Sequence, residues 1–192
     1  MAIPQLRHCI VYRGHGHADE MASEPQPRER SSASVSDRTV RAIMANNLVC
    51  VGSDLDITRV LGLMIERHVG CLPVVDERRR PIGMITKFDL VEQLEVAMRL
   101  ARCGCPLPTD LGVQTADDVM MPLALTLDEN AGIANAASMM ISEDIHHVLV
   151  VDHDRRLVGV VSAKDIVRWV VDYDVAADRR GDRPSAWRSL EG

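Results

Sequence analysis

Two seven-residue segments of the chain carry a glycine, a hydroxyl residue and a carboxylate at one spacing. They read Gly83-x-x-Thr86-x-x-Asp89 and Gly159-x-x-Ser162-x-x-Asp165. Where a helix directly follows a strand, a hydroxyl at the junction lies beside the unpaired N–H groups of the first helical turn, which attract phosphate. A carboxylate three residues later can accept hydrogen bonds from both hydroxyls of a ribose. A glycine within the strand lets a flat ring approach the backbone, so the pattern is suited to holding a nucleotide.

The same residue types at the same spacing also describe a capping box. In a capping box the hydroxyl and the carboxylate satisfy backbone N–H groups of the helix, and no ligand is required. The two interpretations are compatible, because a hydroxyl can cap its helix while no ligand is bound. Both stay open on the residues alone.

The two segments belong to a longer internal repeat. A constant offset of 76 residues (115 − 39) aligns residues 39–91 with residues 115–167 without a gap. Identical pairs include Met44/Met120, Ile57/Ile133, Met64/Met140, Asp76/Asp152, Gly83/Gly159 and Asp89/Asp165. A match of this length indicates two copies of one supersecondary unit.

Each copy predicts the element order β-α-β-β-α. Continuous apolar runs at residues 71–75 and 148–151 predict buried strands. Helical spacing predicts the first helix of each copy, with the stripes Ile57, Val60, Leu61, Met64, Ile65 and Ile133, Ala136, Ala137, Met140, Ile141. Because one such unit is near the lower size limit for stability, we expect its twin to cover its sheet. The predicted fold class is α/β (α+β), with two units packed as a pseudo-twofold pair and a ligand cleft between them.

Residues 69–76 and 83–89, and their counterparts 145–152 and 159–165, resemble a known family. The pattern resembles the CBS domain, and two in tandem resemble a Bateman module, over about residues 39–173. The resemblance implies a non-catalytic regulatory module, without a required cofactor, that binds an adenine nucleotide such as AMP, ADP, ATP or S-adenosylmethionine, alone or with Mg²⁺. It also implies a homodimer that signals to an effector protein. A CBS scaffold that binds no ligand and only mediates protein–protein contacts is the alternative.

The resemblance also implies which residues hold the nucleotide. It assigns the ribose to the two motif carboxylates and the phosphates to basic residues near the strand ends. Gly70 and Cys71 occupy in the first copy the positions of the two histidines in the second, so we expect the two sites to differ. The predicted nucleotide-binding residues are Thr86, Asp89, Ser162, Asp165, His146, His147, Gly70, Cys71, Lys87 and Lys164. For the histidines and lysines, simple exposure to solvent is the other interpretation.

Composition divides the chain further. Residues 21–37 are rich in Ser, Glu, Pro and Arg, and such a segment cannot bury enough surface to fold. We therefore expect a flexible N-terminal tail over residues 1–38, CBS domain 1 over 39–98, a linker over 99–114, CBS domain 2 over 115–173 and a flexible C-terminal tail over 174–192.

Several functional classes are disfavoured. The net charge of −6 argues against nucleic acid as a partner, because duplex-binding proteins carry basic patches. No apolar run approaches the roughly 18 residues of a membrane span. The chain lacks the P-loop, the dinucleotide-binding G-x-G-x-x-G, H-E-x-x-H and G-x-S-x-G motifs, so we do not expect an enzyme.

The five cysteines are odd in number and their spacing suggests no disulfide framework, which favours a cytoplasmic protein. Four potential metal ligands crowd the N-terminal segment, at His8, Cys9, His15 and His17. Their spacing matches no standard zinc site, and we predict no metal site.

Overall fold

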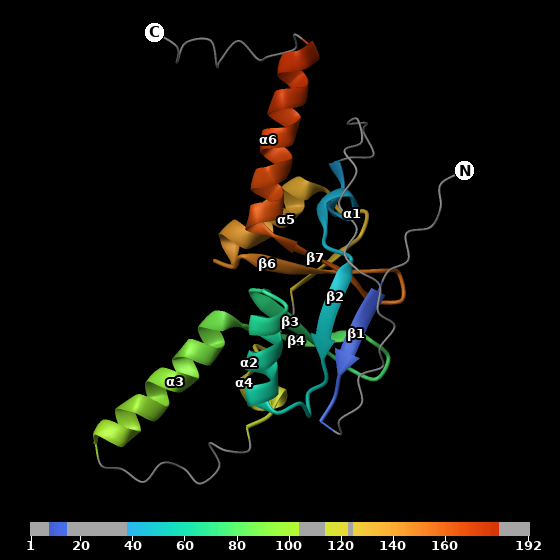
Figure 1. Ribbon diagram of the computed structural model, residues 1–192. Coiled ribbons are helices and arrows are strands. Elements are labelled where there is room, and N and C mark those ends of the chain that lie inside the picture. Colours follow the sequence, from blue (N-terminus) through green and yellow to red (C-terminus); the bar gives the residue numbers. More distant parts are fainter. Residues whose placement is uncertain (1–7, 15–37, 104–113, 123–124, 181–192) are drawn as a thin grey trace.

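The computed structural model describes residues 8–14, 38–103, 114–122 and 125–180 of the chain (Figure 1). The first unit contains β1 (His8–Tyr12), α1 (Val40–Ile43), β2 (Asn47–Val51), α2 (Ile57–Glu66), β3 (Cys71–Val75), β4 (Pro81–Thr86) and α3 (Lys87–Arg102). The second contains α4 (Ala116–Val119), β5 (Thr126–Asp128), α5 (Ile133–Ser142), β6 (His147–Val151), β7 (Leu157–Ser162) and α6 (Ala163–Arg180). The predicted β-α-β-β-α order is therefore present twice.

The strands form two sheets, one in each unit. The first has the order β1-β2-β3-β4 and the second β5-β6-β7. In each sheet the last two strands are antiparallel and the preceding strands are parallel. The inner strands β3 and β6 are almost wholly buried, as their continuous apolar runs predicted.

The strand β1 corrects the predicted N-terminal tail. Residues 8–12 pair in parallel with β2 along their whole length, from His8 opposite Asn47 to Tyr12 opposite Val51. The short run from Cys9 to Val11 is apolar and rich in β-branched residues, which is enough for an edge strand because β2 supplies the ladder partner. The rest of the predicted tail, residues 1–7 and 15–37, lies outside the described residues.

Two helices extend beyond the predicted domain ends. Helix α3 continues past residue 98 to Arg102, and α6 continues past residue 173 to Arg180. The α3 extension consists of good helix formers, the α6 extension contains two alanines and two arginines, and glycine next appears only at Gly104 and Gly181. In α3 an ion pair between Glu95 and Arg99, 2.7 Å apart, adds support one turn from the end. Linker residues 104–113 and tail residues 181–192 are outside the described part.

The predicted apolar stripes of α2 and α5 are only partly buried. Val60 and Met64 of α2 face the core together with Leu63, which the stripe omitted. Leu61 and Ile65 are 45% and 62% exposed, and Ile141 of α5 is 83% exposed. Helix α2 therefore buries a face slightly rotated from the predicted one, whereas α5 buries Ile133, Ala136 and Met140 of its predicted stripe. Both helices present their other apolar residues to solvent.

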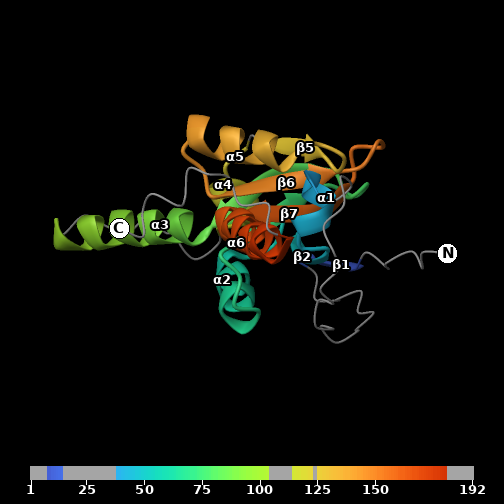
Figure 2. The ribbon, with the colours of Figure 1, turned by 90° about the horizontal axis from the view of Figure 1, so that it is seen from above.

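The two units exchange their leading helices. Helix α1 packs into the core of the second unit, where Val40, Ile43 and Met44 join residues of α5, β6 and β7. Helix α4 packs in return into the first unit, where Ala116 joins α2, β3 and β4. Figures 1 and 2 show α1 beside α6 of the other unit, and Figure 1 shows α4 beside α2. Each core is thus completed by the other half of the chain.

Backbone bridges between the units confirm the pseudo-twofold relation. Thr39 pairs with Gly132 and Thr115 with Asp56, and the 76-residue offset converts one pair into the other. The same offset relates the bridge Ala45–Val160 to the bridge Met121–Met84. Left-handed backbone conformations recur in the same way, at His68 and Asp144 and at Arg79 and Arg155.

The strand glycines Gly83 and Gly159 accommodate methionines, which corrects the expected approach of a ligand ring at these positions. A Cβ on Gly83 would lie 2.9 Å from Met120 Cγ and 2.9 Å from the Met121 carbonyl oxygen. A Cβ on Gly159 would lie 2.8 Å from Met44 Cγ. Both methionines come from the leading segment of the other unit, so the glycines serve the contact between the units.

Substituting these glycines should weaken the whole fold. We expect Gly83→Ala and Gly159→Ala each to lower the free energy of unfolding by about 1–3 kcal/mol, because an added methyl group overpacks a filled contact. Denaturant unfolding followed by circular dichroism measures the change. Gly62→Ala is the matched control: its Cβ would meet only side-chain ends 3.8 Å away, and alanine favours helix. An unchanged stability of G83A and G159A would contradict the packing described.

Candidate functional site

The hydroxyl and carboxylate of each motif lie at the junction between a strand and the helix that follows. At the β4–α3 junction Thr86 donates its backbone N–H and its hydroxyl to Asp89 Oδ2, at 2.6 and 2.8 Å. The N–H of Asp89 donates back to the Thr86 hydroxyl oxygen at 3.4 Å. The residues therefore form a capping box, the interpretation that the sequence left open beside ligand binding.

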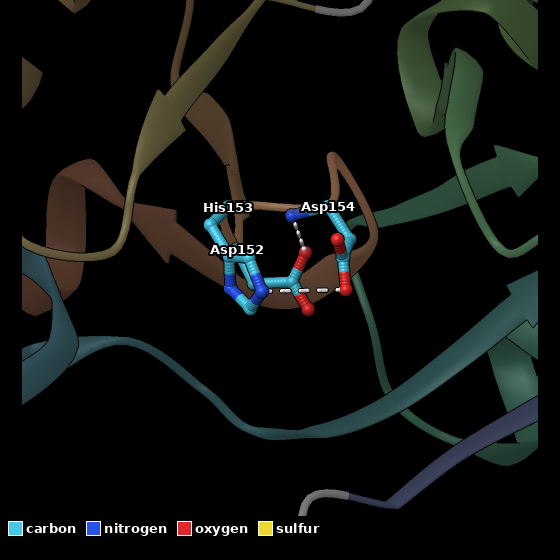
Figure 3. Close-up of side chains that lie close together, drawn as sticks. All are labelled: Asp152, His153 and Asp154. Carbon is cyan, nitrogen blue, oxygen red and sulfur yellow. Dashed lines mark hydrogen bonds and ion pairs between the residues drawn. The ribbon is translucent and has the colours of Figure 1, made fainter.

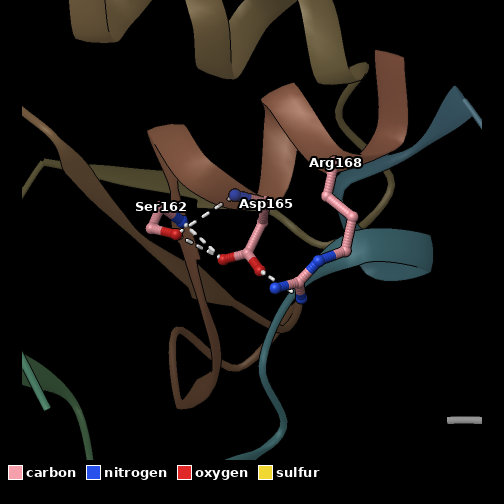
Figure 4. A network of polar contacts seen from close by, with 3 residues as sticks. All are labelled: Ser162, Asp165 and Arg168. Carbon is pink, nitrogen blue, oxygen red and sulfur yellow. Dashed lines mark hydrogen bonds and ion pairs between the residues drawn. The ribbon is translucent and has the colours of Figure 1, made fainter. Parts of the chain in front are cut away.

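The β7–α6 junction repeats this geometry (Figure 4). Ser162 donates its N–H and its hydroxyl to Asp165 Oδ2 at 3.0 and 2.6 Å, and the N–H of Asp165 donates to the serine oxygen at 3.2 Å. Both bonds to each carboxylate use the same oxygen. Because a carboxylate offers about four acceptor positions, capping the helix leaves it able to accept further hydrogen bonds.

A charge that the sequence analysis missed lies beside the second junction. Arg168 Nη1 is 3.8 Å from Asp165 Oδ1, one helical turn along α6, and Figure 4 shows the guanidinium reaching toward this carboxylate. The 76-residue offset places Glu92 at the corresponding position of the first unit. The i, i+3 spacing was readable in the sequence, and it makes the second junction the more cationic of the two.

Two predicted site residues from different units meet across the molecule. A Cβ on Gly70, which precedes β3, would lie 3.5 Å from the Nε2 atom of His147, the first residue of β6. Backbone hydrogen bonds hold the neighbouring turns: the Lys87 N–H donates to the Gly70 carbonyl, and the Ala163 N–H donates to the His146 carbonyl. The strand ends and the helix starts are thereby tied together in both units.

The environment of His147 favours a neutral imidazole. The ring is partly buried, and desolvation lowers its pKa below the usual 6.5. Charge on the adjacent His146 lowers the pKa further, whereas the carboxylate of Asp165 acts in the opposite direction. The pKa of His147 therefore depends on Asp165, a predicted ribose ligand, and on the neighbouring His146.

The remaining predicted residues are placed as follows. Cys71 is buried opposite Thr86, and burial raises the pKa of its thiol to about 12, so it acts as a small apolar residue. His146, Lys87 and Lys164 are exposed at the two strand–helix junctions. The structure therefore brings together Thr86 with Asp89, Ser162 with Asp165, and Gly70 with His147.

A third group of polar residues lies in the turn between β6 and β7. Asp152, His153 and Asp154 each offer a ligand atom within 4.8 Å of the others (Figure 3). Asp152 Oδ1 already accepts the backbone N–H groups of Asp154 and Arg156, both at 2.9 Å. Asp76 makes the same two bonds in the first unit, to Arg78 and Arg80. We therefore assign the carboxylate of Asp152 to shaping the turn.

The two intertwined units with repeated strand–helix junctions define a tandem module. Comparison with known protein families identifies its class. The CBS domain profile matches residues 40–96 and 116–172, so the chain belongs to the CBS domain family. Among its relatives is hypoxic response protein 1 of Mycobacterium tuberculosis, 28% identical over 71% of this chain and 88% of that protein. The uncharacterized protein MJ1404 of Methanocaldococcus jannaschii is 29% identical over 78% of this chain, which spans only 36% of that protein.

Solved structures show the same fold. The CBS domain pair of protein MJ0100, in complex with 5′-methylthioadenosine and S-adenosyl-L-methionine, matches with a TM-score of 0.59 and 25% identity over 70% of this chain and 97% of that one. Among the helices of the described residues, none combines the length and the apolar character that a membrane span requires.

The partly buried His147 leads us to expect that stability depends on pH. Because the folded state lowers the pKa of His147, the unfolded state binds its proton more tightly. Stability is therefore fully present above the unfolded pKa near 6.5 and is lost as the pH falls below it. We expect His147→Gln to reduce the loss of unfolding free energy between pH 7.5 and pH 5.5, measured by urea titration. His153→Gln, at an exposed turn position, is the control and should keep the wild-type loss; an equal loss in H147Q would contradict the assignment.

Proposed function

We propose that this chain is a regulatory module that binds an adenine nucleotide at its strand–helix junctions and passes the binding to a partner protein as a shift in packing. The observation that carries the proposal is the pair of capped junctions, each aiming a hydroxyl and a carboxylate from the start of a helix. A helix N-terminus attracts phosphate and a carboxylate accepts ribose hydroxyls, so the two parts of a nucleotide have matching partners within one turn.

The second junction is the stronger candidate. His147 and Arg168 lie near Asp165, and their equivalents in the first unit are Cys71 and Glu92. A neutral imidazole donates one hydrogen bond and a guanidinium donates several, so both suit a phosphate or a carboxylate of the ligand. Glu92 would repel the same group. We therefore infer that the β7–α6 junction binds the nucleotide more tightly than the β4–α3 junction.

The complex of the MJ0100 domain pair supports the chemical class of the ligand. Both of its ligands, 5′-methylthioadenosine and S-adenosyl-L-methionine, carry an adenosine group. Transfer to this chain is a proposal that rests on the shared fold and 25% identity. The candidate ligands are therefore AMP, ATP and S-adenosylmethionine, the nucleotides alone or with Mg²⁺ beside their phosphates.

Strand β7 offers a route from ligand to partner. Gly159, three residues before Ser162, contacts Met44 from the leading segment of the first unit. Arg38, just before α1, donates to the Tyr173 hydroxyl of α6 at 3.2 Å. A ligand at the β7–α6 junction therefore acts on the elements that hold the two units together. If it binds one packing of the units better, it shifts the population toward that packing, which a partner can read.

Binding can be tested by isothermal titration with AMP, ATP and S-adenosylmethionine. We expect at least one of them to bind, and Asp165→Asn to weaken its affinity at least tenfold, because a charge-assisted hydrogen bond to ribose contributes more than about 1.4 kcal/mol. Asp89→Asn should have the smaller effect, since the first junction carries the opposing Glu92.

Asp118→Asn is the matched control for these variants. Thr115 donates its N–H and hydroxyl to Asp118 Oδ2 at 2.8 and 2.9 Å, so α4 begins with the same kind of capping box outside the proposed site. This variant should lose a cap and retain wild-type affinity. No binding of any of the three compounds to the wild type would favour the ligand-free scaffold instead.

The helices α3 and α6 also support the proposed homodimer. They extend away from the body of the molecule (Figure 1). Val91 and Leu94 on α3 and their equivalents Val167 and Val170 on α6 are between 51% and 62% exposed. Apolar residues repeated in this way on two helices form a surface that a second copy of the chain can cover.

Disrupting this surface should separate the dimer. We expect the wild type to sediment as a dimer and Val91→Glu/Val167→Glu as a monomer, because a buried unpaired carboxylate costs several kcal/mol. Analytical ultracentrifugation measures both. Glu92→Ala, which changes an exposed polar position of α3, should stay dimeric. A monomeric wild type, or a double variant that stays dimeric, would contradict the proposal.

A further inference from the structure

The thiols of Cys9 and Cys50 lie against each other on neighbouring strands. Cys9 belongs to β1 and Cys50 to β2, and the register places Val11 opposite Cys50, so Cys9 lies diagonally across the ladder on the same face. Their sulfur atoms are 2.6 Å apart, within hydrogen-bonding contact. Both are free cysteines, and Cys50 is buried whereas Cys9 is partly exposed.

The surroundings of the pair give the two thiols different reactivity. The hydrogen bond from Cys50 and the guanidinium of Arg79 lower the pKa of Cys9 to about 7, against the opposing effect of burial. Donation to Cys9 and desolvation raise the pKa of Cys50 well above its usual value. Cys9 is thus the thiol that is partly ionised near neutral pH and partly accessible, which are the properties of an attacking cysteine.

We propose that Cys9 and Cys50 form a reversible disulfide that fastens the edge strand β1 to the first CBS unit. The Cys9 thiolate attacks a sulfur of a low-molecular-weight disulfide, forming a mixed disulfide and releasing one small thiolate. The Cys50 thiol then gives up its proton and attacks the Cys9 sulfur, which releases the second small thiolate. Two protein thiols are oxidised by two electrons, one small disulfide is reduced to two thiols, and both protons end on the released thiols.

The linkage matters because β1 contacts the boundary between the units. Cys9 and Val11 pack on a cluster in which Leu48, Cys50 and Val75 of the first unit meet Leu149 and Leu157 of the second. Arg79 connects the same elements: its side chain donates to the Cys9 carbonyl at 3.5 Å and its own carbonyl accepts the Leu157 N–H at 2.9 Å. A disulfide at this place therefore holds β1 on the surface where the two units pack, independently of any nucleotide.

The experiment uses the full chain with Cys103→Ser/Cys105→Ser, which leaves Cys9, Cys50 and Cys71. The reduced protein is incubated with oxidised glutathione at pH 7.5, blocked with an alkylating reagent and mapped by non-reducing peptide mass spectrometry. We expect a linked peptide joining Cys9 to Cys50, two hydrogens lighter than the reduced pair. Cys71 should be found alkylated or as a free thiol, and not in a disulfide. The oxidised protein should melt about 5–10 °C above the reduced protein, because the bond closes a long loop.

Variants identify the order of events. In Cys50→Ala the Cys50 thiol that would displace glutathione from the mixed disulfide is missing, so Cys9 should accumulate as a glutathione adduct. In Cys9→Ala, Cys50 should stay unmodified, and circular dichroism checks that both variants are folded. The proposal would be overturned if, in the Cys103→Ser/Cys105→Ser protein, Cys9 took glutathione without linking to Cys50, or if neither thiol reacted. Because the wild-type pair is mapped directly, a variant that fails to fold does not remove the test.

Discussion

The exchange of leading helices is the constraint on which the rest of this structure depends. Neither sheet has a complete core by itself, because Met44 fills the space over Gly159 and Met120 fills the space over Gly83. Protein interiors are close-packed, so such a contact tolerates little change in volume. The two units therefore behave as one packed body, and the positions of the two strand–helix junctions relative to each other follow from this packing.

Within that symmetric backbone, two prolines create measurable differences between the units. Leu149 donates its N–H to the Leu125 carbonyl, but its counterpart is Pro73, which has no N–H, and β2 and β3 share a single register pair where β5 and β6 share three. Leu157 donates to the Arg79 carbonyl, and its counterpart is Pro81. The ladder between β2 and β3 is thus shorter than the one between β5 and β6, and the first sheet is the one that has a fourth strand.

Much of this could be predicted from the repeat. The element order, the buried strands and the pairing of Thr86 with Asp89 and Ser162 with Asp165 follow from local spacing and from the offset. The strand at His8–Tyr12 could not be recognised, because five residues carry little signal without knowledge of the partner strand. The predicted role of Gly83 and Gly159 was wrong for a related reason. The neighbour that requires a glycine is a methionine about 40 or 115 positions away, and local patterns do not reveal such contacts.

The exchanged helices also set the order in which the chain can mature on the ribosome. Ala45 bridges to Val160, a separation of 115 positions (160 − 45), so the segment around α1 emerges long before its binding surface exists. During that interval Val40, Ile43 and Met44 have no native cover, although all are buried at the end. Contacts so distant in sequence slow folding and leave an apolar segment available to chaperones or to a second nascent chain. The native cover is complete only once β7 and the first turns of α6 have been synthesised.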